Sequence, residues 1–274
     1  MSPIWPALTF VGAAILAIVR LRRPAEDPVL RENYSGAVVP VTLGQALVFS
    51  AQGAAASSIG LAALAGPVPE WPIPLLLLLG ALILFAVGRL DDGREDGPRG
   101  LHGHVGSLLR GRATTGILKL AMGVLTAAVL AMELGGGSAR VIVATLVIAL
   151  SVNVTNALDV RPGRSLKWAL LILVPVCAAA WGQGVILVAL AYIAAGLVVL
   201  RSDLREAGML GDAGSNPLGL VVGTSLAAVL PTVGLIVALV LLLGLQVAAE
   251  TVTISRLIEG APPLRWLDAL GRRT

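Results

Sequence analysis

The sequence WPIPLLLLLGALILFAVGRLDD, residues 71 to 92, decides the fold. No charged residue occurs between Trp71 and Val87. A helix of about 20 residues crosses a hydrocarbon core of about 30 Å, and a continuously apolar run lacks the alternation of a barrel strand. The stretch therefore predicts a membrane-spanning helix, because a lone segment satisfies its backbone polar groups in lipid only as a helix. It ends in two adjacent carboxylates, Asp91 and Asp92.

The composition extends this prediction to the whole chain. Of its 274 residues 57% are hydrophobic and 13% are charged, whereas a soluble domain has about 25% charged residues. We expect an all-α, polytopic integral membrane protein with about nine transmembrane helices. The single cysteine, Cys177, lies in an apolar segment and excludes an intrachain disulfide. The expected spans are residues 4–21, 39–65, 73–89, 114–132, 140–157, 167–182, 185–200, 218–231 and 232–255.

The basic residues indicate an orientation. Nine crossings put the termini on opposite sides, and all of the 20 Lys and Arg residues except Arg140 then fall on one side. Cytoplasmic loops carry such an excess, so we expect the N-terminus outside and the C-terminus in the cytoplasm. The net charge of +4 is by this interpretation an orientation signal, and it does not indicate a nucleic-acid partner.

The two ends of the chain also follow from the pattern. The first apolar run precedes its arginines, the reverse of a cleavable signal peptide, which predicts a retained helix. Near the other end Pro231 divides a long apolar stretch into two helices. We expect one transmembrane helical domain over residues 1–255 and a cytoplasmic amphipathic tail over 256–274. Leucines and Trp266 among the charges of this tail predict a short interfacial helix.

The aspartate pair is the first of three polar groups at expected helix ends. Adjacent carboxylates at a membrane boundary repel each other unless a cation or a basic partner lies beside them. A divalent metal would satisfy Asp91 and Asp92. The alternative is a solvated helix end beside Arg89 and Arg94.

The second group is NVTNALD, residues 153 to 159. Asn153, Asn156 and Asp159 follow one another at intervals of three, which places them on one helical face. They are candidates for a binding site, and the alternative is hydrogen bonding between helices.

The third group is MLGDAGSNPLG, residues 209 to 219. Its glycines permit a tight turn and a close backbone approach, and Asn216 with Pro217 resembles the N-cap and first residue of a helix. A helix N-terminus next to Gly214 and Ser215 predicts an anion site, and Asp212 could hold the metal that neutralises a phosphate. An ordinary loop is the alternative.

Together, and in this order, these motifs resemble those of the polyprenyl-phosphate N-acetylhexosamine-1-phosphate transferase superfamily. LDD (residues 90 to 92) matches its aspartate pair, NVTNALD its Asn-x-x-Asn-x-x-Asp, and GDAGSNPLG its Gly-Asp-x-Gly-Ser-x-x-Leu-Gly. VPVTLG (residues 39 to 44) is similar to a Pro-Thr-x-Gly-Gly stretch, with Val41 in the threonine position. The resemblance covers nearly the whole chain.

The resemblance implies a Mg²⁺-dependent enzyme of the bacterial cell membrane. A polyprenyl phosphate attacks the β-phosphate of a UDP-linked amino sugar at the cytoplasmic face, and UMP leaves. Such phosphoryl transfer depends mostly on positioning and charge neutralisation. The resemblance makes Asp212 the leading metal ligand, Asp91 the group that deprotonates or positions the lipid phosphate, and Asp92 its partner, all three forming the metal set.

The same resemblance assigns the substrate contacts. Asn153, Asn156 and Asp159 would line the nucleotide pocket, next to Gly214 and Ser215. Lys119 and Arg112 are candidates to meet diphosphate oxygens, although positive-inside charges near anionic lipid explain them equally. His104, with His102, is a candidate phosphate or substrate contact, and the alternative is a solvent-exposed loop.

The chain also departs from the superfamily. After Asp159 it reads VRPGR where the family has Gly-x-Asp-Gly, and the histidine-rich motif near the C-terminus is missing. Arg161, Arg164 or the tail RWLDALGRR are candidates for replacement charge, which suits a diphosphate and not proton transfer.

Three functions follow. The first is an active sugar-1-phosphate transferase of a short, divergent branch, acting in cell-envelope glycan synthesis. The second is a non-catalytic relative that binds polyprenyl phosphate or regulates envelope synthesis. The third, a lipid or solute transporter, requires acids near the bilayer midplane, where only Glu250 qualifies. The sugar, the lipid length and the oligomeric state, with a homodimer as one option, stay open.

Overall fold

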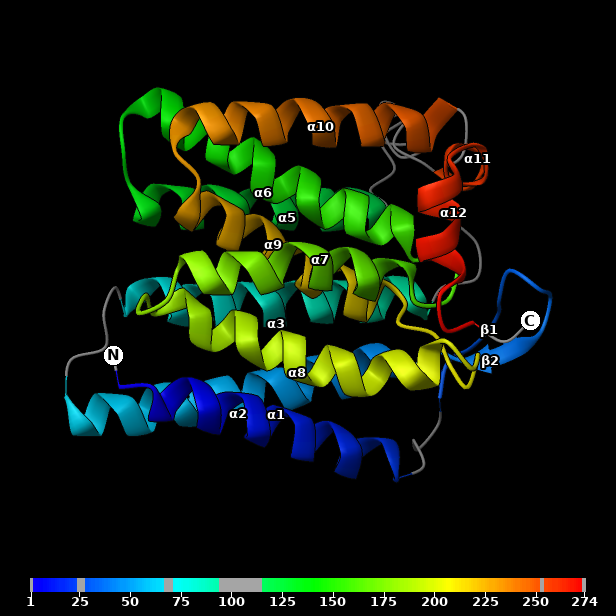
Figure 1. Cartoon of the computed structure of the whole chain (residues 1–274), viewed down its shortest axis with the longest axis horizontal. Coiled ribbons are helices and arrows are strands. Elements are labelled where there is room, and N and C mark those ends of the chain that lie inside the picture. The colour runs from blue at the N-terminus through cyan, green and yellow to red at the C-terminus, as the bar shows by residue number, and fades with distance from the viewer. Residues whose placement is uncertain (1, 24–27, 67–70, 94–114, 252–253, 273–274) are drawn as a thin grey trace.

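The computed structural model describes residues 2–23, 28–66, 71–93, 115–251 and 254–272. These residues form a helical bundle with one small β-hairpin at its end (Figure 1). The elements are α1 (Ile4–Leu21), β1 (Leu30–Glu32), β2 (Val38–Pro40), α2 (Leu43–Ala65), α3 (Pro72–Asp92), α5 (Thr115–Leu134), α6 (Ser138–Leu158), α7 (Arg164–Ala179), α8 (Val185–Asp203), α9 (Asp212–Val229), α10 (Thr232–Thr251), α11 (Ile254–Gly260) and α12 (Pro262–Ala269).

Seven helices of the described residues are long and apolar enough to span a membrane: α1, α2, α3, α5, α6, α8 and α10. This confirms an all-α, multi-pass membrane protein. A helix also occupies each of the two other expected ranges, but α7 has 16 residues and α9 is rich in small and polar residues. The number of crossings and the orientation stay predictions.

The helix ends differ from the expected ones where tertiary contacts intervene. The range expected to begin at residue 39 begins as a helix at Leu43, because Val38–Pro40 pairs with Leu30–Glu32 as an antiparallel hairpin. This hairpin was not expected from the sequence, because its strands have three residues each. The expected interfacial helix in the tail is two short helices, α11 and α12.

Helix α9 lies inside the bundle, with α6 and α3 as its main neighbours (Figure 1). Most of its residues are buried. In contrast α10, at the edge of the bundle, has two buried residues, Leu235 and Leu242, and its exposed side includes Val233, Val240, Leu241 and Val247. In a multi-pass membrane protein we expect such an apolar side to face lipid, because lipid tails are as apolar as leucine.

Glycines allow α9 to approach α6 at backbone distance. A Cβ at Gly219 would lie 2.6 Å from the carbonyl oxygen of Ser151, and one at Gly223 would lie 2.6 Å from the Cα of Ile148. These separations are too short for any side chain. Small residues of this kind are typical of helix pairs in membranes, where van der Waals packing replaces the hydrophobic effect.

An arginine from another helix caps the C-terminal end of α9. Arg140 on α6 donates from Nη1 to the Leu230 carbonyl (3.0 Å) and from Nη2 to the Ala227 carbonyl (2.8 Å). A cation stabilises the negative end of a helix dipole and satisfies its free carbonyls. The basic residue that stands apart in the sequence pattern therefore has a structural partner.

The glycine contact predicts a stability difference between two similar substitutions. Gly219→Ala should lower the free energy of unfolding by about 1–3 kcal/mol, the usual cost of overpacking, and so lower the melting temperature in detergent. Gly244→Ala on α10 is the matched control, since a Cβ there meets nothing within 4 Å and alanine favours a helix. Equal melting temperatures for the two variants would contradict the packing assigned to Gly219.

Candidate functional site

The N-terminus of α9 is capped by a carboxylate from a different helix. The two oxygens of Asp92, at the end of α3, accept the backbone N–H of Asp212 (2.9 Å) and of Ala213 (3.0 Å). Asp92 is buried, and no local side chain caps this helix. A carboxylate at this position satisfies free N–H groups and stabilises the positive end of the helix dipole.

This tertiary cap moves the start of α9. The sequence predicted Asn216 as N-cap and Pro217 as first residue, and that prediction is wrong, because the helix begins at Asp212 with Pro217 inside it. A proline in the interior removes one backbone hydrogen bond. The earlier start is possible because Asp92 supplies the acceptors that a local N-cap residue would otherwise provide.

The amides expected to receive a phosphate already have partners within the protein. Asp92 accepts those of Asp212 and Ala213, and Asp159 accepts the N–H of Gly211 at 3.0 Å. The Ser215 hydroxyl is fully buried and donates to the side-chain oxygen of Asn156 at 2.8 Å. In this conformation these groups form hydrogen bonds between the helices and are not available to bind a phosphate.

The glycines around Asp212 serve close backbone packing. A Cβ at Gly214 would lie 2.6 Å from the Cα of Gly44 on α2, and one at Gly88 would lie 2.5 Å from the Asp212 carbonyl. Gly211 has φ +66°, a left-handed conformation that favours glycine. The small residues therefore let α2 and α3 contact the start of α9.

Three charged side chains meet at the partly exposed face of this junction. The Lys119 ammonium on α5 lies 2.5 Å from an oxygen of Asp212 and 3.4 Å from an oxygen of Asp91. The side chains are 18%, 21% and 25% exposed for Lys119, Asp212 and Asp91. The two carboxylates thus share one cation and remain accessible from outside the bundle.

The residues present fit a divalent metal only in part. Asp91 and Asp212 direct oxygens at one cation, which is the donor type that Mg²⁺ prefers. Asp92, expected as a third ligand, uses both oxygens for the α9 cap. Within the ranges that the structure describes, no group of three or more His, Cys, Asp or Glu side chains is arranged for a metal. A bound Mg²⁺ would need water or substrate oxygens to complete its shell.

Arg31 is a residue of the site that the sequence analysis missed. From strand β1 its Nε and Nη2 donate to the Asp92 carbonyl (3.1 and 2.9 Å), and Nη2 also donates to the Asp91 carbonyl (3.3 Å). It thereby caps the C-terminal end of α3, where both aspartates lie. No local signal predicts this contact, because it joins residues about 60 positions apart through the unexpected hairpin.

The NVTNALD stripe divides between two neighbours. Asn156 and Asp159 reach the start of α9, whereas the Asn153 amide donates to Gln246 on α10 at 3.0 Å. Asn153 therefore follows the alternative of hydrogen bonding between helices. Glu250, the acid considered for a transporter, is exposed in the last turn of α10 and not at its middle.

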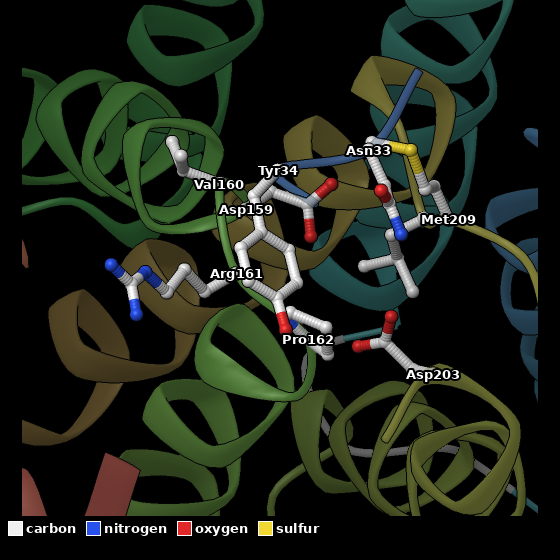
Figure 2. A pocket seen from close by; sticks show the side chains of 9 residues that line it. Asn33, Tyr34, Asp159, Val160, Arg161, Pro162, Asp203 and Met209 are labelled. Carbon is white, nitrogen blue, oxygen red and sulfur yellow. The ribbon is translucent and has the colours of Figure 1, made fainter. Parts of the chain in front are cut away.

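A small pocket lies beside this junction. Figure 2 shows the Asp159 carboxylate and the Tyr34 ring on one side and Asp203 on another, while Arg161 points away. Burial, reinforced by the Asp203 carboxylate, raises the pKa of Asp159 well above its usual range. The pocket holds about 20 Å³, room for a water molecule and far below the roughly 300 Å³ of a small-molecule site. A nucleoside does not fit in it as the chain lies here.

The basic residues considered as replacement charge bind the tail instead. Arg164 and Arg272 both donate to the Asp268 carboxylate, at distances from 2.7 to 3.0 Å. Arg272 also donates to the Pro162 carbonyl, and Lys167 donates to the Asp268 carbonyl at 2.8 Å. We call Arg164, Lys167, Asp268 and Arg272 the tail clamp. The two arginines lower the pKa of Asp268 against the opposing effect of its burial.

Three candidates lie outside the described residues. They are His104, His102 and Arg112.

The α9 cap predicts different costs for the two neighbouring aspartates. Asp92→Ala leaves two buried N–H groups without an acceptor and should cost about 1–3 kcal/mol in the free energy of unfolding. Asp91→Ala removes a partly exposed ion pair, worth about 0–1 kcal/mol, and leaves the N–H groups of α9 with their acceptor. Thermal unfolding in detergent, followed by tryptophan fluorescence, checks the order. A larger loss for Asp91→Ala would contradict the role assigned to Asp92.

Comparison with known proteins leaves the family open. No protein-family model matches the chain, and no curated protein matches it.

Proposed function

We propose that this protein transfers a sugar-1-phosphate from a UDP-linked amino sugar to a polyprenyl phosphate, as a divergent relative of the superfamily that its motifs resemble. The observation that carries the proposal is the meeting of Asp91, Lys119 and Asp212 from three helices at one accessible place. Residues 91 and 212 are far apart in sequence and belong to different motifs. If the two motifs serve one reaction, their residues must lie at one site, and Asp91 and Asp212 bind the same ammonium.

The site offers the groups that phosphoryl transfer needs. A divalent ion, when bound, supplies positive charge to the transferred phosphoryl group, and Asp91 and Asp212 are the residues that would hold it. Without a metal ion, Lys119 neutralises both carboxylates. Its side chain is also long and flexible enough to turn toward phosphate oxygens. Asp92 accepts the backbone N–H of Asp212, and Arg31 binds the C-terminal end of α3 next to Asp91, so both residues help to position the two carboxylates.

The position of the site suits a lipid substrate. Asp91 lies at the end of α3 and Lys119 in the first turns of α5, both membrane-spanning candidates. A phosphate on a lipid reaches this depth without leaving the bilayer surface. We infer that the polyprenyl phosphate approaches Asp91 from the membrane and that the nucleotide sugar approaches from the aqueous side.

A second candidate function is a non-catalytic lipid-phosphate-binding relative. The contacts that favour it are the Lys119 bridge, which satisfies both carboxylates without a metal, and the occupied amides of α9. The exposed position of Glu250 at a helix end gives a transporter no support.

The enzymatic proposal is tested by product release. Purified protein with Mg²⁺, a polyprenyl phosphate and a panel of UDP-amino sugars should release UMP with at least one donor. Asp212→Asn should reduce the rate by about 10²-fold or more, the size of effect seen when a charge-stabilising group is lost. Glu250→Gln, an exposed acid on α10, is the matched control and should keep the wild-type rate.

The same panel separates the two functions. Absence of UMP with every donor, together with retained binding of polyprenyl phosphate, would overturn the enzymatic proposal and favour the non-catalytic relative.

Metal binding is tested without turnover. If a divalent ion and Lys119 compete for the same carboxylates, Lys119→Met should make the melting temperature rise with added Mg²⁺ or Mn²⁺ more steeply than in wild type, because the variant lacks the internal cation. Lys119→Met combined with Asp212→Asn should lose this dependence. An unchanged metal dependence in Lys119→Met would count against a metal between Asp91 and Asp212.

A further inference from the structure

The tail lies across the end of the bundle, whereas the other helices run along it. Figure 1 shows α11 and α12 as short segments that turn away from the direction of α10 at the end where the hairpin also lies. Helix α10 has 20 residues and thus a length of about 30 Å, the thickness of the hydrocarbon core. A span of this length ends at the headgroup layer, which adds about 5–8 Å on each side.

The tail clamp fixes which side of α12 faces the protein. Asp268 binds Arg164 and Arg272, and the carbonyls of Leu267 and Asp268 accept the Lys167 ammonium. Arg164 is 6% exposed and Asp268 is 11% exposed. Four charged groups held this way set the rotation of the helix about its axis.

The opposite side of α12 is apolar and uncovered. Trp266 is two residues from Asp268, which places it about 200° around the helix, and Leu270 follows four residues later on the same side as Trp266. Trp266 is 66% exposed and Leu270 49% exposed. Both side chains are therefore available to an apolar partner.

Exposed basic residues occur on both tail helices. Arg256 on α11 and Arg265 on α12 are exposed, and Glu259, the exposed acid of α11, binds Arg161. Their charge is complementary to an anionic lipid surface. The tail follows α10 in the chain, and the exposed side of α10 carries valines and leucines.

We propose that α12 binds the headgroup layer of the surrounding bilayer, with Trp266 and Leu270 inserted and the tail clamp holding its other side on the α6–α7 loop. Trp266 suits this layer because its ring is apolar and its N–H finds partners among headgroups. The clamp joins the lipid-bound helix to Pro162 and Arg164, next to Asp159. The proposal depends on the membrane location and not on the enzymatic function.

Bromolipid quenching tests the insertion. The full-length chain with Trp5→Phe, Trp71→Phe, Trp168→Phe and Trp181→Phe retains Trp266 as its only tryptophan. In nanodiscs with lipids brominated near the headgroup end of the acyl chain, we expect about a twofold loss of Trp266 emission relative to unbrominated lipid, because an interfacial helix sits about 5–10 Å into the headgroup boundary. Aqueous iodide should quench it less than free tryptophanamide.

If this variant fails to fold, a second measurement tests the same insertion. The difference in emission between the wild-type chain and Trp266→Phe isolates the same side chain, and it should show the same loss. Free quenching by iodide with no effect of bromolipid would overturn the proposal, as would protection from both quenchers that disappears on dilution, which would indicate a second copy of the chain as the occupant.

Discussion

The structure depends on the burial of α9 with a charged cap at each end. A helix in an apolar interior must satisfy its free N–H and carbonyl groups without water, and each failure costs several kcal/mol. Asp92 from α3 accepts two N–H groups at one end, and Arg140 from α6 donates to two carbonyls at the other. The negative charge of Asp92 lies at the positive N-terminal end of the helix dipole, and the positive charge of Arg140 lies at its negative C-terminal end. Both interactions are therefore favourable. The glycines of α9 then let its neighbours approach at backbone distance.

This constraint gives the polar motifs their positions. Once Asp92 is bonded to the start of α9, its neighbour Asp91 is carried to the side of Asp212, where Lys119 meets both. The same bonds occupy the amides that a phosphate would otherwise use. The accessible chemistry is therefore concentrated in two carboxylates and one ammonium, while Asp92 is structural.

A second polar layer supports this junction from outside. Arg31 binds the end of α3, Asp159 binds Gly211, and the tail clamp binds the α6–α7 loop that carries Asp159. The loop that departs most from the superfamily pattern is thus the one that the tail covers. Arg164 at the start of α7 and Arg272 of the tail neutralise Asp268, and Arg161 of the loop pairs with Glu259. These pairs account for the arginines at this point without a substrate.

The sequence by itself determined the membrane class and the position of each long helix, because an apolar run of sufficient length has one stable form in lipid. It also singled out Asp91, Asp212 and Lys119, since charges at helix ends stand out against an apolar chain. Tertiary structure alone decided that Asp92 is a cap, that α9 begins at residue 212, and that a hairpin of two three-residue strands brings Arg31 to the site. Each of these is a hydrogen bond between residues distant in sequence, and no local pattern of residues encodes which distant partner will satisfy a backbone group.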